Sequence, residues 1–270
     1  MTTPLALPDM PIERWLEAAR ARRSRRSFDG TRPGDEELAA LRDACESLRP
    51  HPGARAVLAP SVSEELFRGV LGSYGRVTGV SSAMLFVGAT DSSAALAAVG
   101  YTGEALVLEA TALGLGTCWV GGMFNGGMAR KAAGATDDEK VYAVTPVGRP
   151  MQKVTGTEKF VYGMRKPKPR KPVEHIAPEL HDMSWPTWAR PGVESARIAP
   201  SAHNRQPWRF RADDGSIVIS FDGPDTPIVS KRLDCGIAML HFELAVRAAH
   251  ASGSWELLEH RSDVARFTLG

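Results

Sequence analysis

Residues 199–210 read Ala-Pro-Ser-Ala-His-Asn-Arg-Gln-Pro-Trp-Arg-Phe, and this stretch carries the most specific information in the chain. Small, polar and turn-forming residues come first and an aromatic alternation follows, so the pattern predicts an exposed loop that leads into a strand. Ser201, Asn204 and Gln206 have short side chains that donate and accept hydrogen bonds, which suits the edge of a planar heterocycle. Taken alone, the local pattern is more typical of an Asn/Ser-rich turn with capping roles.

The composition is that of an ordinary globular protein of 270 residues, long enough to bury a sizeable core. The formal net charge of +2 is too small to imply a nucleic-acid or membrane partner. Cys45, Cys118 and Cys235 are far apart and form no CxxC pair, which predicts neither a disulfide framework nor a metal site. Because residues 1–10 show no export signal and no apolar run is long enough to cross a membrane, we expect a cytoplasmic protein.

Hydrophobic periodicity predicts alternating helices and strands, which indicates an α+β or α/β class. Helices are expected at 11–23, 35–48, 101–115, 125–133, 184–195 and 235–250, with a short one after a capping box at 61–64. The helix at 184–195 is expected to be short and broken by Pro186 and Pro191. Strands are expected at 83–89, 141–147, 208–212, 217–221, 255–258 and 264–269, the third and fourth joined as a hairpin. Residues 151–178 are rich in proline and basic residues, which predicts an extended connector.

Two basic segments stand far apart in the sequence, at residues 22–28 and 165–172. Guanidinium forks with a nearby hydroxyl form the donor set that best holds a phosphate dianion. The first segment, Arg-Arg-Ser-Arg-Arg-Ser-Phe, has this composition, and the second contains Lys168-Pro169-Arg170. The alternatives are a solvated basic helix end and, less well matched by the balanced total charge, a nucleic-acid patch.

Residues 114–122 read Gly-Leu-Gly-Thr-Cys-Trp-Val-Gly-Gly and follow an apolar helical pattern. Because glycine has no side chain, a backbone N–H in this stretch can approach a ligand closely. These glycines end a helix rather than opening one after a strand, so they are not the dinucleotide-binding fingerprint. A helix C-cap followed by a tight turn is the alternative interpretation.

Together these segments resemble the flavin-dependent nitroreductase family. The sequence PSAHNRQPWRF is similar to the PSxxNxQPW segment of that family, and RRSRRSF is similar to its RRSxRxF segment. The resemblance implies FMN as cofactor and an α+β, nitroreductase-like fold with mixed or antiparallel sheets flanked by helices. It also implies the residues that bind FMN: Arg22, Arg23, Ser24, Arg26, Lys168 and Arg170 at the phosphate and ribityl end, Gly121 and Gly122 beside the flavin N5, and Pro200, Ser201, Asn204 and Gln206 along the ring or ribityl edge.

The order of the motifs departs from the usual family pattern. In the usual homodimer the phosphate segment and the PSxxNxQPW loop lie close together in one chain, whereas here they lie in different halves. The chain therefore resembles a tandem-repeat branch in which two fused half-units imitate a dimer. This implies a first half at 1–150, a connector at 151–183, a second half at 184–270, one FMN site per chain and a chain able to act as a monomer. A weak echo supports it, because Gly103-Glu104-Ala105 and Gly236-Ile237-Ala238 each open a long apolar helical pattern.

The resemblance implies an FMN-dependent oxidoreductase that takes electrons from NADH or NADPH and passes them to a nitroaromatic, a quinone or a related small molecule in a two-step exchange. No catalytic side chain and no metal are expected, because a flavin carries the chemistry while the protein binds and orients it. Two alternatives stay open: a different flavin reaction, such as reductive dehalogenation or double-bond reduction, and a non-catalytic flavin-binding or flavin-less protein that acts through protein contacts.

Overall fold

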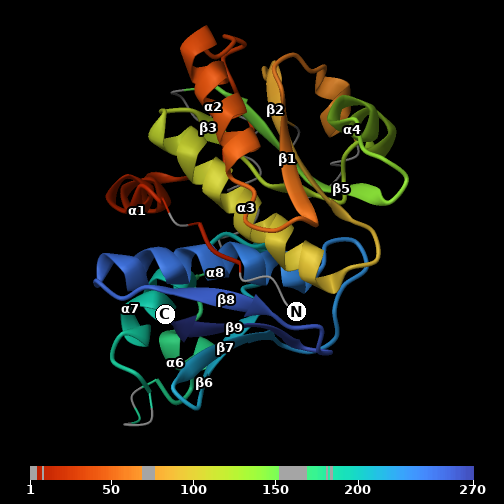
Figure 1. Cartoon of the computed structure of the whole chain (residues 1–270). Helices are drawn as coiled ribbons and strands as arrows, with labels where there is room; N and C mark the ends of the chain where they lie inside the picture. The colour runs from red at the N-terminus through yellow and green to blue at the C-terminus, as the bar shows by residue number, and fades with distance from the viewer. Residues whose placement is uncertain (1–4, 8, 69–76, 152–168, 181, 183–184) are drawn as a thin grey trace.

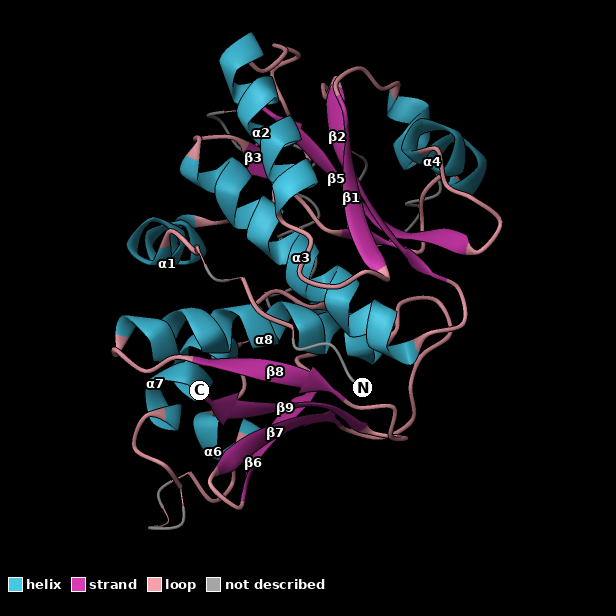
Figure 2. Ribbon diagram, in the orientation of Figure 1, coloured by secondary structure: helices cyan, strands magenta, loops and turns pink. Residues whose placement is uncertain are grey.

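The computed structural model describes residues 5–7, 9–68, 77–151, 169–180, 182 and 185–270 (Figure 1). Two antiparallel sheets lie toward opposite ends of the molecule, with long helices between them (Figure 2). The helices are α1 (Ile12–Ala21), α2 (Asp35–Ser47), η1 (Glu64–Phe67), α3 (Ser93–Ala112), α4 (Gly126–Ala133), α6 (Val173–Ile176), α7 (Ala189–Arg197), η2 (Ala202–Asn204) and α8 (Lys231–Ala248). The strands are β1 (Ala54–Ala59), β2 (Ser82–Ala89), β3 (Gly116–Thr117), β4 (Val120–Gly121), β5 (Glu139–Gly148), β6 (Trp208–Asp213), β7 (Ser216–Phe221), β8 (Gly253–Leu257) and β9 (Asp263–Leu269). The predicted α+β class, with antiparallel sheets flanked by helices, is confirmed.

The two sheets have the same strand order. The first runs β1-β2-β5-β3, with β4 also pairing to β5, and the second runs β6-β7-β9-β8. Along the chain both follow one plan: two adjacent strands, a long helix, an edge strand, and a last strand that inserts between that edge strand and the others. All of these pairs are antiparallel. The long helix is α3 in the first sheet's segment of the chain and α8 in the second's.

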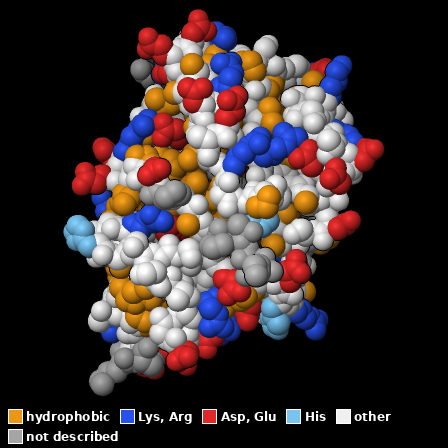
Figure 3. All heavy atoms as spheres, in the orientation of Figure 1, with side chains coloured by type: hydrophobic (Ala, Val, Ile, Leu, Met, Phe, Trp, Pro, Cys, Tyr) orange, Lys and Arg blue, Asp and Glu red, His pale blue; other side chains and the backbone are white. Residues whose placement is uncertain are grey.

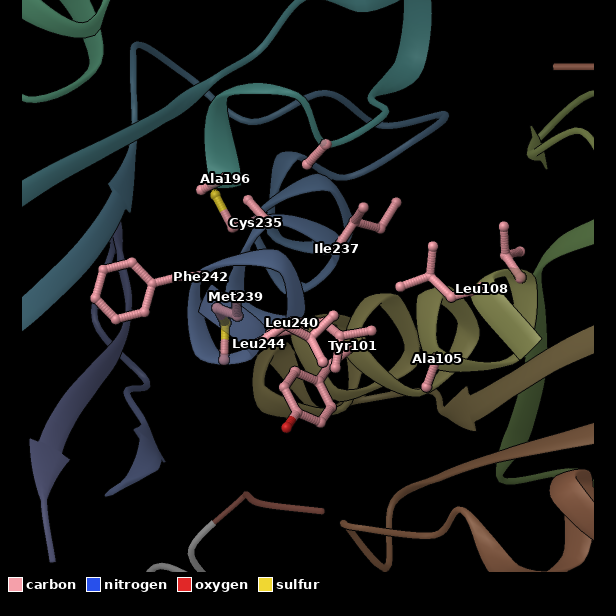
Figure 4. Packing of buried hydrophobic residues seen from close by; sticks show 14 of the residues in the cluster. Tyr101, Ala105, Leu108, Ala196, Cys235, Ile237, Met239, Leu240, Phe242 and Leu244 are labelled. Carbon is pink, nitrogen blue, oxygen red and sulfur yellow. The ribbon is translucent and has the colours of Figure 1, made fainter. Parts of the chain in front are cut away.

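The helices α3 and α8 pack against each other between the sheets (Figure 4). Their backbones approach at two glycines, and the two contacts are reciprocal. A Cβ on Gly100 would lie 2.1 Å from the carbonyl oxygen of Leu233, and a Cβ on Gly236 would lie 1.9 Å from the carbonyl oxygen of Ala97. Each glycine therefore meets the residue three positions before the other glycine, which is the pattern of a contact across a two-fold axis. The two-fold relation therefore makes Gly100 the counterpart of Gly236. The repeat predicted from the sequence had paired Gly236 with Gly103, three residues further along α3.

One hydrophobic core joins the two halves, since the larger buried cluster contains side chains from both sheets and from the helices between them. Figure 4 shows Tyr101 of α3 beside Leu240 of α8, while Phe242 lies on the opposite side of α8. The ring of Phe242 stacks on Phe210 of β6 with centroids 5.5 Å apart. Because α8 is buried on both sides, its apolar side chains link the first half of the chain to the second sheet.

Each sheet is extended beyond the same edge strand by a segment from the N-terminal region. Ser24 pairs with Thr117 of β3, and Leu5 pairs with Trp255 of β8. Backbone hydrogen bonds of 2.7 and 3.1 Å join Leu5 to Trp255, and both side chains are fully buried. Because Leu5 precedes the first sheet in the chain but completes the second, the two halves are interlocked.

Most of the predicted elements are confirmed with shifted ends, and the structure differs from the predictions at a few places for local physical reasons. The strand β1 was not predicted, because Ala54–Ala59 is short and lacks a run of β-branched or aromatic residues. The helix expected after 61–64 is a 3₁₀ turn capped by Ser63 in the described part. Pro191 does not break α7, because it lies in the first turn, where no N–H is needed for the helix.

The expected connector is only partly described, since residues 152–168 lie outside the described ranges. Within its described part, α6 forms one helical turn where an extended chain was expected. The predicted hairpin of β6 and β7 is confirmed, and its turn residues Asp214 and Gly215 have φ of 47° and 74°. Such angles define the two-residue turn that matches the twist of a hairpin. Within the described ranges, no helix has both the length and the apolar character needed to span a membrane.

Candidate functional site

The first basic segment lies between α1 and the edge of the first sheet. Ser24 pairs with Thr117 of β3, and the Arg25 amide donates to the Thr117 carbonyl over 2.8 Å. The Arg26 carbonyl accepts a hydrogen bond of 2.9 Å from the Thr78 amide. These backbone bonds hold the segment against the glycine-rich turn at 114–122, so two motifs that are far apart in the sequence are neighbours in space.

The arginines of this segment have different environments. The Arg23 guanidinium donates to the carbonyls of Arg20 and Arg22, each over 2.8 Å, and so caps the exposed end of α1. The Arg22 side chain is 9% exposed, and its Nε lies 4.0 Å from Oε1 of the fully buried Glu104. The Nη1 atom of Arg22 is buried without a hydrogen-bond partner in the described part of the chain. A buried guanidinium nitrogen in this state favours an anionic ligand beside it.

The second basic segment reaches the same place through Arg170. Its Nη1 donates to the Ala199 carbonyl over 2.5 Å and to Oδ1 of Asn204 over 3.1 Å. Burial, followed by the positive charges of Arg22 and Arg197, lowers the pKa of Arg170 to about 10. The structure therefore brings the two basic segments together, and it places the loop at 199–206 beside them. Lys168 lies outside the described residues.

The loop at 199–206 has a strained backbone. His203, Asn204 and Gln206 have φ of 53°, 50° and 47°, in the left-handed region that side chains other than glycine rarely adopt. Each such residue costs about 1–3 kcal/mol and persists where the surroundings fix it, which is common at binding sites. Ser201 contributes to this fixing, because its Oγ accepts a 2.9 Å hydrogen bond from the Gln206 amide.

The Gln206 side chain is 2% exposed and bonds within the chain. Its Nε2 donates to the carbonyls of Pro169 and Asn204, and its Oε1 accepts a 2.7 Å hydrogen bond from the Lys171 amide. These bonds join the loop to the second basic segment and use both polar ends of the amide. The geometry favours Gln206 as a link between the two segments over a direct contact with a ligand, while the predicted ligand role of the half-buried Ser201 and Asn204 stays open.

Gly121 and Gly122 lie against the segment that precedes α8. A Cβ on Gly121 would lie 2.9 Å from Cγ2 of Val229, and a Cβ on Gly122 would lie 2.4 Å from Cγ2 of Ile228. Gly122 also has a φ of +75°, which favours glycine by itself. The two halves thus meet closely at these glycines. This close contact explains why glycine occupies both positions, whether or not a ligand binds there. The approach of their backbone to a flavin stays a prediction.

Sequence reasoning missed a buried polar cluster that lies next to Arg22. Oε2 of Glu104 accepts a 2.7 Å hydrogen bond from Nε1 of Trp119, and Oε1 lies 2.9 Å from Nε2 of His241. Arg197, at the end of α7, was also missed, although its charge acts on Arg170. A charged residue within the apolar stretch of α3 was the available signal for Glu104.

The positive charges gathered at the site suit the binding of an anion. Arg22, Arg23 and Arg197 all lower the pKa of Arg170, and Glu104 is the carboxylate that opposes them. Several guanidinium groups against one buried carboxylate, with one guanidinium nitrogen lacking an acceptor, suit a phosphate group. The residues present therefore fit the phosphate end of FMN. Among the described residues, no cluster of His, Cys, Asp or Glu could hold a metal ion.

Comparison with protein families gives a match over most of the chain. The family model described as "Putative TM nitroreductase" matches residues 15–246. No curated protein matches the chain.

Solved structures of similar proteins include a "putative nitroreductase" from Thermotoga maritima, which is 23% identical with a TM-score of 0.59 and covers 94% of this chain and 93% of its own. A nitroreductase with bound FMN from Bacteroides fragilis is 17% identical with a TM-score of 0.43, over 52% of this chain and 90% of its own. An oxidoreductase containing FMN is 21% identical with a TM-score of 0.46, over 63% of this chain and 90% of its own. The first of these likenesses shows the fold.

Proposed function

The chain belongs to the nitroreductase family whose model matches residues 15–246, and from this premise we propose that it is an FMN-dependent oxidoreductase. It would take reducing equivalents from NADH or NADPH and pass them to a nitroaromatic, a quinone or a related small molecule in a two-step exchange. The observation that carries the proposal is the convergence of the two basic segments on one buried place, where Arg22 has a nitrogen without an acceptor.

Different residues would bind different parts of the cofactor. Arg22, Ser24, Arg26 and Arg170 would hold the phosphate and ribityl end, and Arg23 would add positive charge from the end of α1. Pro200, Ser201 and Asn204 would line the ring or ribityl edge, with Gln206 holding that loop in place. Gly121 and Gly122 would face N5, and Lys168 would join the phosphate end. These assignments follow the sequence motifs, and the contacts of Arg22, Arg170 and Asn204 support them most directly.

Bound FMN would supply two-electron transfer between a nicotinamide and the acceptor. The protein's own part is to bind and orient, and the arginines do this at one end because their charges and forks match a phosphate. The strained loop at 199–206 supplies rigidity at the other edge, since its conformation is fixed by bonds to Arg170 and Lys171 before any ligand arrives. No acid or base side chain is assigned to the chemical step.

We propose further that the chain imitates a family dimer by itself, with halves at 1–150 and 184–270 and a connector at 151–183. The equal strand orders of the sheets and the reciprocal contacts of Gly100 and Gly236 support two half-units related by a two-fold axis. The phosphate segment comes from the first half and the loop at 199–206 from the second, so one FMN site lies between them. A monomer would then be complete. The three buried, unpaired cysteines are consistent with a cytoplasmic location.

The purified protein tests the proposal directly. We expect flavin absorbance, retained as FMN, that bleaches when NADH or NADPH is added without oxygen. A colourless protein that FMN cannot reconstitute would overturn the proposal. A yellow protein that neither nicotinamide reduces would support the alternative of flavin binding without catalysis.

Arg22→Ala tests the phosphate end. Loss of a charged hydrogen bond of about 1.5–3 kcal/mol predicts FMN binding weaker by about tenfold to a hundredfold, measured by quenching of flavin fluorescence. Riboflavin, which has the ribityl chain but lacks the phosphate, should lose much less affinity. Arg211→Ala is the matched control, because Arg211 forms an exposed ion pair with Asp263 on the second sheet. Equal FMN affinity in the Arg22 and Arg211 variants would refute the phosphate site.

A further inference from the structure

Glu104 lies where the glycine-rich turn, α8 and the phosphate segment meet. It is fully buried on α3, where its carboxylate accepts from Nε1 of Trp119 over 2.7 Å and contacts Nε2 of His241 at 2.9 Å. Its Oε1 is also 4.0 Å from Nε of Arg22. Trp119 belongs to the glycine-rich turn, His241 to α8 and Arg22 to the phosphate segment. One carboxylate therefore contacts the turn, the other half of the molecule and the basic segment.

The charges around Glu104 are unbalanced in favour of arginine. Arg170 is half-buried, and Arg22, Arg23 and Arg197 lie near enough to lower its pKa, while Glu104 acts in the opposite direction. Arg23 is exposed and Arg197 also pairs with Glu194 at 3.4 Å, so Arg22 and Arg170 are the two cations that depend most on Glu104. Like charges brought together out of water repel strongly, and a buried charge is tolerated only when a partner offsets it. Glu104 is the fully buried carboxylate in contact with this group, so it offsets the arginines when no phosphate is present.

The contact with Arg22 leaves the binding side of that arginine available. Glu104 faces Nε of Arg22, whereas Nη1 is the buried atom that lacks a partner in the described part of the chain. A phosphate at Nη1 would therefore join Glu104 as a second anion beside the same guanidinium. Two anions sharing one set of cations weaken each other's binding, because each reduces the positive potential that the other meets.

We propose that Glu104 is the resident counter-charge of the phosphate-binding arginines: it stabilises the site before the cofactor binds and lowers the affinity of the site for the phosphate group of a flavin. Glu104 thereby sets how strongly the protein prefers phosphorylated over unphosphorylated flavin, and it keeps the bound cofactor exchangeable. The inference rests on the proposed FMN site.

Glu104→Gln removes the charge and keeps the shape. The amide oxygen can still accept from Trp119, and the amide nitrogen can donate to Nε2 of His241. We expect the ratio of FMN affinity to riboflavin affinity to rise by about tenfold, because the phosphate then meets a more positive site. The unliganded variant should melt at a lower temperature than the wild type, and saturating FMN should restore most of that loss. Glu104→Asp keeps the charge and should keep the wild-type ratio within about twofold.

Glu243→Gln is the matched control on α8. Glu243 is equally buried, and it accepts a 2.7 Å hydrogen bond from the hydroxyl of Tyr101, which Figure 4 shows among the apolar side chains between α3 and α8. It also pairs with Arg247, and it is not among the main charges acting on Arg170. Its replacement should lower stability without changing the FMN to riboflavin ratio, which separates a charge effect at the site from a general loss of packing.

Inorganic phosphate separates this inference from the proposed function. If the wild type does not bind FMN, the proposed function fails, but phosphate should still raise the melting temperature of Glu104→Gln more than that of the wild type or of Glu243→Gln. If Glu104→Gln does not fold alone, the double variant with Arg22→Gln restores the charge balance and should fold. The inference is overturned if the ratio and the phosphate effect are unchanged or reduced in Glu104→Gln, or if the double variant is no more stable than Glu104→Gln.

Discussion

Replacing Gly236 by alanine should destabilise the protein, although alanine is the better helix former. A Cβ at this position would lie 1.9 Å from the carbonyl oxygen of Ala97 and 3.0 Å from the Tyr101 nitrogen. Both are backbone atoms of a buried helix, so α3 and α8 would have to separate by about 1 Å to restore an ordinary contact. Overpacking of this kind costs about 1–3 kcal/mol or more, whereas the helical preference for alanine returns about 0.5–1 kcal/mol. We expect a net loss of about 2 kcal/mol.

Urea unfolding of the protein without flavin measures this loss as a lower midpoint at an unchanged slope. Gly126→Ala in α4 is the control, because in the described part of the chain no atom beyond its chain neighbours and its own helix backbone lies within 4 Å of the added Cβ. That change should leave stability equal or slightly raised. Two substitutions of the same kind in two helices are thus expected to act in opposite directions, for a reason that helix preference alone does not provide.

The reciprocal contact makes a sharper test. Gly100→Ala should cost about as much as Gly236→Ala, because its Cβ would lie 2.1 Å from the Leu233 carbonyl oxygen. If one separation of the helices relieves both contacts, the double variant should lose clearly less than the sum of the two single losses. A Gly236→Ala protein as stable as the wild type would refute the close approach, and strictly additive losses would refute the shared separation.

Three further predictions concern pH and local structure. The hydrogen bond from Arg55 holds the pKa of Glu139 at about 2, so the pair stabilises the fold above about pH 4.5 and loses this effect as the pH falls. Glu139→Gln should therefore lower the free energy of unfolding by up to about 3 kcal/mol at pH 7 and by much less at pH 2, measured by urea unfolding. Arg205→Ala leaves the buried carboxyl of Asp234 without its cationic partner, and burial already raises the pKa of Asp234 to about 6. The loss of about 3–5 kcal/mol should therefore be larger at pH 8 than at pH 5, and an equal loss at both pH values would contradict this. Gly215→Ala places a side chain at a φ of +74° in the hairpin turn and should lower thermal stability by about 1 kcal/mol, with the fold unchanged by circular dichroism.

The sequence predicted the elements that carry a clear local pattern. The strand β2 was visible as the apolar run from Ala83 to Ala89, and the hairpin followed from the turn residues Asp214 and Gly215. The strand β1 was invisible because alanine and arginine carry little strand preference, so that its pairing with β2 decides its structure. The plan shared by the two sheets could not be read from the residues either, since strand order depends on pairing across the whole chain.

For the site, motif resemblance predicted which segments would meet, but not what each side chain does there. Arg22 and Arg170 converge as expected, whereas Gln206 turned out to hold the loop to the second basic segment. Glu104 and His241 come from different halves, so their contact depends on the packing of α3 on α8, which no local pattern contains. Gly121 shows the same limit, because the sequence could not indicate that Val229 of the other half would press against it.

The two-fold relation of α3 and α8 also bears on the proposal of a single FMN site in each chain. At the first corner the edge of β3 pairs with Ser24, and the buried carboxylate nearby, Glu104, lies 4.0 Å from Arg22 and opposes the positive charges that act on Arg170. At the matching corner the edge of β8 pairs with the apolar Leu5, and the buried carboxylate Glu243 has its own partner in Arg247. The first corner has an excess of positive charge that a phosphate can balance, while the charges described at the second already balance each other. The difference in charge between equivalent corners therefore favours a single flavin for each chain, and a flavin content of two per chain would contradict it.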